Sequence, residues 1–393
     1  MRAKRGVGGA PVKGRRVLVR VDFNVPLDSQ GQVADDRRIV EALPTIHHLI
    51  TAGARTILMS HLGRPDGRKD PKYSLRPVVR RLSSLLGRPV PFVEEIVGMQ
   101  ALEHTARLGN GDVLMLENLR FHPGEEANDP AFAAQLARLG ELFVEDAFGT
   151  VHRAHASTVG VPERLPAFAG LLVEKEVREL SRLVDRPDRP YAVLVGGAKV
   201  DDKLPLLESF LGRADTLLIG GALSFPFLAA RGTAPGGAPP APALVELAGQ
   251  FLAKAETAGT HVVLPSDLVA APPGADGTAV FPVGGIPPGV AAEDIGPASR
   301  AAFIAALHGA RTVFWNGPLG RAEDPRFAAG TRDVLASLAT PGGYRVAAGG
   351  DSARIARDLG VEGVFQFVST GGGASLEFVQ GVELPGLAVL PDA

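Results

Sequence analysis

Ten short apolar runs rich in Val, Ile and Leu recur along the chain, separated by longer segments with helical periodicity. Nearly continuous hydrophobicity over so few residues is typical of strands buried on both faces of a parallel sheet. The alternation of strand and helix predicts the α/β class. The runs occupy residues 15–23, 54–60, 112–118, 142–148, 191–197, 214–221, 261–265, 311–317, 344–350 and 364–370.

A chain of 393 residues with this many strands exceeds one compact sheet, so two doubly wound parallel-sheet domains are expected. The segment 173–190 is the expected connector, because EKEVRELSRLV has a helical pattern and the prolines of RPDRP would end it. It separates an N-terminal domain, 1–172, from a C-terminal domain, 191–377.

Composition excludes several classes of protein. The net charge of −2 gives no general attraction to nucleic acid or to an anionic membrane. The absence of cysteine excludes disulfides and thiolate catalysis, and it is compatible with a cytoplasmic protein. We expect no membrane span and no secretory signal, because no unbroken apolar stretch is long enough and the basic N-terminus lacks an apolar segment.

In the first half of the chain, cationic and polar side chains follow successive predicted strands. Ligands of open α/β sheets bind outside the carboxyl ends of the strands. Separate surface salt bridges are the alternative interpretation, but the repetition favours one site for a small, multiply charged anion, which arginine binds through paired hydrogen bonds. The residues are Arg20, Asp22, Asn24, Arg38, His61, Arg64, Arg120, His122, His152, Arg153 and His155.

In the second half the strand ends are rich in glycine, in VGGAK, IGGALS, WNGPLG, AAGGDS and VSTGGGAS. Glycines let a ligand approach the backbone, and a following helix N-terminus offers N–H groups to an anion. Lys199 and Lys203 stand at an expected helix start, where cations oppose the helix dipole, so a bound phosphate would explain both. The stretch is not a P-loop, because the spacing and the final Ser or Thr are missing. Asp351 is either a helix N-cap or a magnesium contact.

A polyanion site in one half and a nucleotide site in the other predict a phosphotransferase with two substrates. A dinucleotide-dependent oxidoreductase is one alternative, although no GxGxxG opens a helix with an acidic residue at the required distance. A non-catalytic anion-binding protein is another, and the two lysines and the GGDS turn argue against it.

Nine stretches together resemble the phosphoglycerate kinase family in order and spacing, from about residue 15 to 390: RVDFNVP, DDRRIVEALPTI, SHLGRP, ENLRFHPGEE, DAFGTVHRAHAS, GGAKVDDK, WNGPLG, GGDS and STGGGASLEF. The resemblance implies two Rossmann-like lobes joined by a helix, with a cleft between them and residues from about 378 to 393 packing back on the first. It implies reversible phosphoryl transfer from 1,3-bisphosphoglycerate to MgADP, giving 3-phosphoglycerate and MgATP, in a cytoplasmic monomer.

The resemblance also assigns roles to individual residues. Contacts to phosphoglycerate fall on Asp22, Phe23, Asn24, Arg38, His61, Leu62, Gly63, Arg64, Arg120 and Arg153. Contacts to ADP or ATP fall on Lys203, Glu323, Gly349, Gly350, Asp351 and Ser352, with Asp351 beside Mg²⁺. Stabilisation of the phosphoryl group in transfer falls on Arg38, Lys199, Gly371, Gly372 and Gly373. The chain departs from the family pattern at Val151, where alanine is usual, and at Ala322, where an aromatic residue is usual.

Overall fold

A computed structural model describes residues 3–233, 236–271, 277–287 and 289–393. The chain forms two compact units. The first ends at Glu179 and also includes Glu383–Ala393, and the second comprises Leu180–Val382. The division falls inside helix α5 (Leu171–Val184), within the predicted connector. The chain therefore returns to the first unit after Val382.

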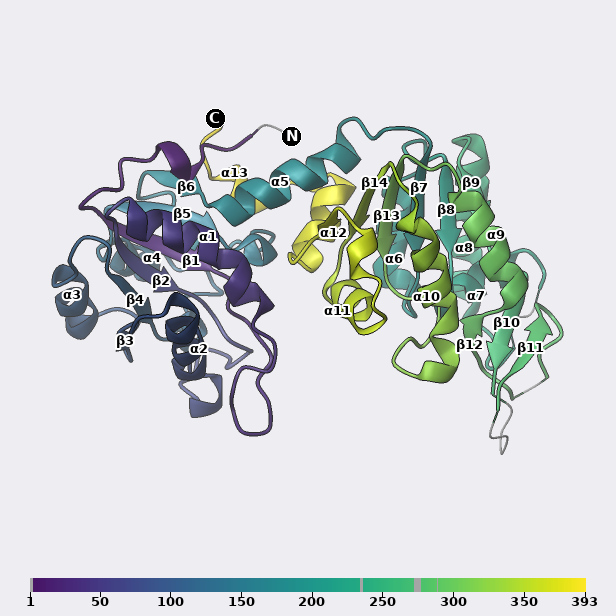
Figure 1. The fold of residues 1–393 in the computed structure, drawn as a ribbon, viewed down its shortest axis with the longest axis horizontal. Coiled ribbons are helices and arrows are strands. Elements are labelled where there is room, and N and C mark those ends of the chain that lie inside the picture. The colour runs from purple at the N-terminus through teal and green to yellow at the C-terminus, as the bar shows by residue number, and fades with distance from the viewer. Residues whose placement is uncertain (1–2, 234–235, 272–276, 288) are drawn as a thin grey trace. The chain divides into compact units, whose positions relative to one another are not determined.

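The described residues of the first unit form a six-stranded sheet in the order β3-β4-β2-β1-β5-β6 (Figure 1). Every pairing in it is parallel, and β4 and β5 are buried along their whole length. The strands are β1 (Arg16–Val21), β2 (Arg55–Met59), β3 (Phe92–Val93), β4 (Val113–Leu116), β5 (Leu142–Asp146) and β6 (Ala167–Ala169).

Amphipathic helices cover this sheet and bury their apolar stripes on it. Val78, Val79 and Leu82 of α2 join the same core as strand residues such as Val19 and Leu58. The helices are α1 (Arg37–Thr51), α2 (Arg76–Leu86), α3 (Met99–Ala106), α4 (Pro130–Ala137) and α13 (Pro385–Ala388), with short helical turns η1 (Val7–Gly9), η2 (Pro71–Tyr73), η3 (Leu119–Phe121), η4 (Phe148–Thr150) and η5 (Ala156–Gly160).

The described part of the second unit has its own six-stranded parallel sheet, in the order β15-β14-β13-β7-β8-β9. Its two central strands, β7 and β13, are buried throughout. The strands are β7 (Tyr191–Val195), β8 (Thr216–Ile219), β9 (His261–Val263), β13 (Thr312–Asn316), β14 (Tyr344–Ala347) and β15 (Phe367–Val368).

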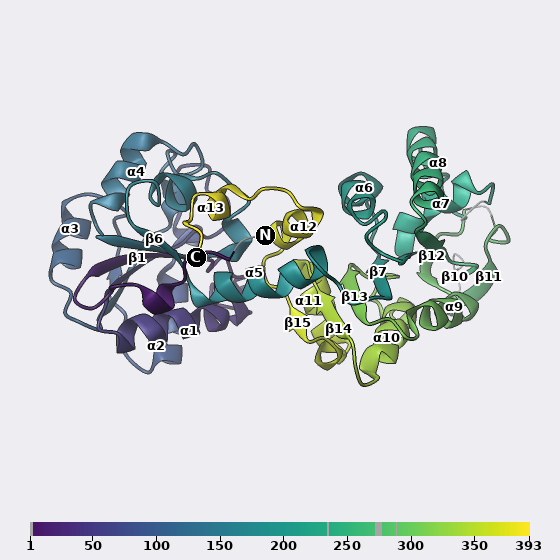
Figure 2. The same ribbon diagram turned by 90° about the horizontal axis from the view of Figure 1, so that it is seen from above.

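Helices lie on both faces of this sheet (Figure 2). They are α6 (Val200–Ser209), α7 (Phe225–Ala230), α8 (Pro242–Thr257), α9 (Pro297–Leu307), α10 (Ala329–Ala336), α11 (Gly350–Asp358) and α12 (Gly373–Gln380), with turns η6 (Gly221–Ser224), η7 (Pro325–Phe327), η8 (Ser337–Ala339) and η9 (Glu362–Val364). A small antiparallel sheet, which the sequence did not predict, joins β10 (Asp267–Ala270) to β11 (Ala279–Pro282) and β12 (Ala292–Ile295).

Each large sheet changes its direction of winding at one point. In the first unit the chain winds from β1 outward through β2 and then returns to place β5 on the other side of β1. In the second unit β8 and β13 flank β7 in the same way. A crevice at the carboxyl ends of the strands forms at such a point, and ligands bind there. These two edges therefore position the candidate sites.

No helix within the described residues is both long enough and apolar enough to span a membrane.

Candidate functional site

Cationic side chains gather at the carboxyl edge of the first sheet. We use the name basic cluster for Arg20, Arg38, His61, Arg120, Arg153 and His155. The loop after β2 supplies His61, η3 after β4 supplies Arg120, and the segment after β5 supplies Arg153 and His155. Burial is the largest cause of the lowered pKa of His61. The positive charges of Arg20, Arg120 and Arg38 lower that pKa further. Side chains from the ends of four strands therefore lie close together at this edge of the sheet.

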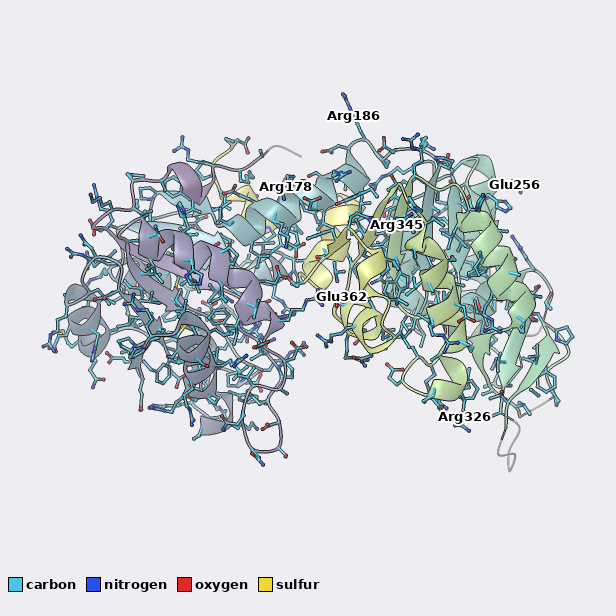
Figure 3. The ribbon with its side chains drawn as sticks, viewed as in Figure 1. Arg178, Arg186, Glu256, Arg326, Arg345 and Glu362 are labelled. Carbon is cyan, nitrogen blue, oxygen red and sulfur yellow. The ribbon has the colours of Figure 1, made fainter. Side chains whose placement is uncertain are left out.

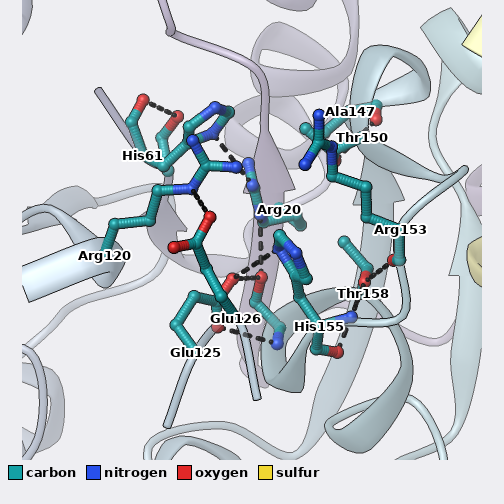
Figure 4. Close-up of polar contacts among 12 residues, drawn as sticks. Arg20, His61, Arg120, Glu125, Glu126, Ala147, Thr150, Arg153, His155 and Thr158 are labelled. Atoms are coloured by element: carbon teal, nitrogen blue, oxygen red, sulfur yellow. Dashed lines mark hydrogen bonds and ion pairs between the residues drawn. The ribbon is translucent and has the colours of Figure 1, made fainter. Parts of the chain in front are cut away.

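Arg20 organises the interior of the basic cluster (Figure 4). It is 1% exposed, and its Nε donates to Ser157 Oγ at 2.9 Å. Its Nη2 lies 3.1 Å from Nδ1 of His61. A guanidinium can only donate, so Nδ1 of His61 accepts. Because burial and the surrounding cations hold the pKa of His61 well below its usual value, the ring is neutral and carries its proton on Nε2. His61 is thus fixed as a neutral donor.

The buried carboxyl group of Glu125 holds Ser157, the hydrogen-bond partner of Arg20, in place. Ser157 donates to Glu125 through both its Oγ, at 2.5 Å, and its backbone N–H, at 3.1 Å. Burial raises the pKa of Glu125, and the charge of Arg20 and the two bonds from Ser157 oppose that rise. The chain Glu125–Ser157–Arg20–His61 holds each side chain in one orientation.

Hydrogen bonds between the loops fix the edge of the cluster. Asn118 Oδ1 accepts the N–H groups of Leu62, at 3.2 Å, and Arg120, at 3.1 Å. Asn24 Oδ1 accepts from Gly63 N at 2.9 Å, and Arg120 Nη1 donates to the Gly63 carbonyl at 2.9 Å. The backbone of Leu62 and Gly63 is therefore tied to two neighbouring strand ends.

The remaining predicted residues of the first unit differ in exposure. Arg38 Nη1 donates to Asp22 Oδ2 at 2.7 Å, which joins the start of α1 to the end of β1. Phe23 is buried, and its N–H donates to Ser60 Oγ. Arg153 is exposed and donates from Nε to His152. Arg64 is exposed and contacts no hydrogen-bond or ion-pair partner among the residues that the structure describes.

The lowered pKa of His155 can be tested through the pH dependence of the protein's stability. Burial, then Arg20 and Arg120, lower its pKa to about 3. Between about pH 6.5 and 3 the unfolded chain binds a proton at this residue that the folded chain does not, so stability is lost as the pH falls. From pH 6.5, where the unfolded residue is already half-protonated, to pH 5.0, the wild type should lose about 1.6 kcal/mol more than His155→Gln, because the full slope is about 1.36 kcal/mol per pH unit. Urea unfolding followed by circular dichroism at both pH values measures the difference.

The control is His104→Gln, which removes an exposed histidine of α3 in the same unit. It should leave the pH dependence as in the wild type. Parallel curves for the wild type and His155→Gln would show that His155 titrates normally in the folded protein.

The second unit has a pocket of about 350 Å³ at the carboxyl edge of its sheet, which we call the glycine-lined pocket. Gly197 and Gly221 line it from the ends of β7 and β8, and Glu323 and Asp351 line it from the segments after β13 and β14. A Cβ at Gly196 would overlap the carbonyl oxygen of Pro318, so the two central strand ends approach as closely as glycine allows.

The two lysines flank the same edge. Lys199 is the N-cap residue of α6, is exposed, and makes no hydrogen bond or ion pair within the described chain. Lys203 lies in the first turn of α6 and is half-buried, and its Nζ donates to Oδ1 of Asn316 at the end of β13. Asn316 Nδ2 in turn donates to the carbonyl of Ala348 after β14, at 2.7 Å. Lys203 is thereby anchored, whereas Lys199 is not.

The turn Gly349–Ser352 leads from β14 into α11. Gly349 has φ +100°, and a Cβ there would lie 2.5 Å from Asn316 Nδ2. Gly350 begins α11, and Asp351 is exposed in its first turn. Ser352 is buried and its Oγ accepts from Gly317 N at 2.8 Å, so this hydroxyl supports the neighbouring turn.

Glu323 Oε1 accepts from Arg354 at 2.9 Å. The pKa of Glu323 is lowered chiefly by a backbone hydrogen bond and next by this bond from Arg354.

Gly371, Gly372 and Gly373 form the start of α12, where Gly372 has φ +57°. They are not among the residues that line the glycine-lined pocket. Gly371 N donates to Ser369 Oγ at 3.2 Å, which leaves the turn anchored at its first residue.

Four structural partners in these sites were not predicted: Asn118, Glu125, Ser157 and Asn316. Asn118 lies two residues after β4 and Asn316 is the last residue of β13, and this position at a strand end is the signal that would have singled them out. Nothing in the sequence separates the buried Glu125 from its neighbour Glu126, which is exposed.

Comparisons with known proteins agree with this architecture. The family model described as phosphoglycerate kinase matches residues 7–382. Phosphoglycerate kinase of Thermus thermophilus is 53% identical over 383 residues, 96% of this chain and 97% of that protein. That of Pelotomaculum thermopropionicum is 50% identical over 392 residues, 99% of this chain and all of that protein. The structure of phosphoglycerate kinase from Coxiella burnetii superposes with a TM-score of 0.89 at 34% identity, covering 98% of both chains. The chain belongs to the phosphoglycerate kinase family.

Proposed function

We propose that this chain transfers a phosphoryl group reversibly from 1,3-bisphosphoglycerate to MgADP, giving 3-phosphoglycerate and MgATP. The proposal rests on the residues at the carboxyl ends of the strands in the two large sheets, in a chain that belongs to this family. One edge gathers cations that match a small polyanion, and the other pairs glycine turns with an anchored lysine.

The basic cluster is the proposed phosphoglycerate site. Arg38, Arg64, Arg120 and Arg153 would bind carboxylate and phosphate oxygens, and His61 would donate its Nε2 proton. Asp22 orients Arg38, and the ties to Leu62 and Gly63 keep the loop backbone in place. Because Arg120 is buried while Arg64 and Arg153 are exposed, the proposed phosphoglycerate site combines a fixed cation with exposed side chains that can close on a ligand.

The glycine-lined pocket is the proposed nucleotide site. Lys203 would bind a nucleotide phosphate, Glu323 the ribose, and the Gly349–Ser352 turn the phosphates through its N–H groups. Lys199, Arg38 and the Gly371–Gly373 turn would stabilise the phosphoryl group in transfer.

Mg²⁺ fits this site through one protein ligand. No group of three or more acidic or histidine side chains forms a metal site in the described part of the chain. Mg²⁺ commonly takes one or two carboxylates and completes its shell with water and substrate phosphates. Asp351 lines the pocket and is the carboxylate that would hold it. The ion would neutralise charge on the nucleotide phosphates.

The reaction needs no general base in the direction that consumes ATP. The nucleophile is the carboxylate of 3-phosphoglycerate, which is ionised at neutral pH. Catalysis then rests on alignment and on charge stabilisation of the phosphoryl group. ATP consumption that depends on 3-phosphoglycerate, followed in a coupled assay, tests the proposal. Equal ATP consumption without 3-phosphoglycerate would contradict it.

We also propose that the enzyme acts as a monomer in the cytoplasm and uses neither a nucleic acid nor a membrane as partner. The support is its small net charge and the reaction proposed above. Sedimentation of the purified enzyme at micromolar concentration tests the oligomeric state.

Arg64→Ala should weaken binding of 3-phosphoglycerate by about 10- to 100-fold, the usual cost of a lost charged hydrogen bond. The affinity for ADP should stay as in the wild type, because Arg64 lies in the first unit. Calorimetric titration with each ligand measures both effects. Arg68→Ala, in the same loop and also exposed, is the control. Lost ADP binding with intact phosphoglycerate binding would mean that the two sites are assigned to the wrong units.

A further inference from the structure

The second unit has a second pocket, of about 520 Å³, at the edge of its sheet where the strands begin. We call it the amino-edge pocket. Arg311, before β13, lines it together with Gly342 and Gly343, before β14, and His308, after α9. The glycine-lined pocket lies at the other ends of the same strands. Since a strand rises about 3.3 Å per residue, the length of β13 separates the two edges by roughly 13 Å. The amino-edge pocket therefore has no part in the reaction proposed above.

Arg345, which is labelled in Figure 3, is a buried charge that lines this pocket. It lies on β14, lines the pocket and is 6% exposed. Its Nη2 donates to the carbonyl oxygens of Thr340, at 2.7 Å, and Gly342, at 2.6 Å. Its Nε has no hydrogen-bond partner, and no carboxylate within the described residues pairs with the guanidinium. Burial alone accounts for its lowered pKa. Buried arginines are normally paired with an anion.

The rest of the lining adds positive charge. His308 and Arg311 are both exposed beside Arg345, and the lining residues that the structure describes include no aspartate or glutamate. Arg311 has no ion-pair partner in the part of the chain that the structure describes. Fixing the turn at residues 340–343 explains the Nη2 bonds of Arg345, but it explains neither the unpaired Nε nor the two further cations.

The opposite wall of the pocket is apolar. Ile304, Leu307 and Leu338 line it from α9 and from η8. Such a wall offers nothing to a bare ion, but it would contact a short carbon skeleton attached to a charged group. Pockets with an apolar lining and a few convergent polar groups are typical of small-molecule sites.

We propose that the amino-edge pocket binds a small phosphorylated metabolite. Arg345 and Arg311 would take the phosphate oxygens through charge-assisted hydrogen bonds, and the apolar wall would take the carbon skeleton. Occupation of this pocket supplies the anion that Arg345 lacks. The ligand is separate from both reactants of the phosphoryl transfer.

Methyl NMR of the full-length enzyme distinguishes this pocket from the reaction site. The enzyme is labelled at the isoleucine δ1 methyl groups and saturated with MgADP and 3-phosphoglycerate, so that the proposed substrate sites are filled. Ile304 lines the amino-edge pocket and Ile355 the glycine-lined pocket. Titration with inorganic phosphate, and separately with glycerol 3-phosphate, should shift the Ile304 signal and leave that of Ile355 in place. Glycerol 3-phosphate should bind more tightly, because it alone has a carbon skeleton.

Two variants and one control complete the test. Arg345→Met should weaken the binding measured at Ile304 by about tenfold or more. Arg311→Ala, which changes an exposed side chain and leaves the fold intact, should weaken it several-fold. Arg326→Ala removes the same charge near the opposite end of the unit and should bind as the wild type does (Figure 3). An unmoved Ile304 signal at 10 mM of either ligand, or equal affinity in all three variants, overturns the proposal.

Discussion

Lys199→Ala is expected to lower kcat by about 10²–10³ while the dissociation constant for ADP changes little. Removal of one electrostatic contact to a transition state typically has an effect of this size. Lys199 is exposed at the N-cap of α6 and has no partner within the described residues, so its loss leaves no buried group unpaired. The fall in rate would therefore report on the reaction rather than on folding. Steady-state kinetics and calorimetry with ADP measure the two quantities.

Lys203 and Lys254 give the matched comparisons. Lys203→Ala should act mainly on nucleotide affinity, because Asn316 holds that side chain beside the pocket. Lys254→Ala, which removes an exposed lysine paired with Glu208 on the same unit, should leave both constants near their wild-type values. An unchanged kcat in Lys199→Ala would contradict the role assigned to Lys199.

Arg38→Met is the second substitution expected to have a large effect. It keeps an unbranched apolar stem but removes the charge and the donors, so kcat should fall by about 10²–10³. KM for 3-phosphoglycerate should rise as well, because Asp22 would remain beside the anion site without its 2.7 Å partner. Kinetics with varied 3-phosphoglycerate at saturating MgATP separate the two effects.

Arg81→Met is a close control for Arg38→Met. Arg81 also pairs with an aspartate, Asp36, at 2.6 Å, but it lies exposed on α2. Its loss should change kcat by less than twofold, since an exposed ion pair adds little to stability and none of the cluster depends on it. Equal losses in both variants would show that the effect of Arg38 comes from charge in general and not from contact with the substrate.

Ten of the strands that the structure describes were predicted, whereas β3, β6 and the three strands of the small antiparallel sheet were missed. Each of the ten predicted runs contains a strand, because residues buried on both faces leave an apolar signal that few helices imitate. Strands β3 and β6, which were missed, span only two and three residues. The small antiparallel sheet was missed for another reason: β11 is only half-buried, and its short run is bounded by glycine and proline.

The candidate site was predicted at the level of its charged residues and not at the level of their partners. Cations repeated at strand ends are visible in a sequence, since parallel strands place those ends together. The partner of each cation is set by tertiary distances. Arg20 contacts Ser157 across 137 positions of sequence, and Lys203 contacts Asn316 across 113. No local pattern encodes such pairs.

The order in which the chain is synthesised conflicts with the order in which the first unit can be completed. Residues 383–393 belong to that unit, where Gly386 N donates to the Val151 carbonyl at 2.8 Å and Ala393 N to the Ala3 carbonyl at 2.9 Å. Residues 180–382 must be translated in between, which at 5–20 residues per second takes roughly 10–40 s. During that interval the nascent first unit lacks its closing segment. The second unit, although translated later, is continuous in sequence and is therefore the first that the ribosome delivers whole.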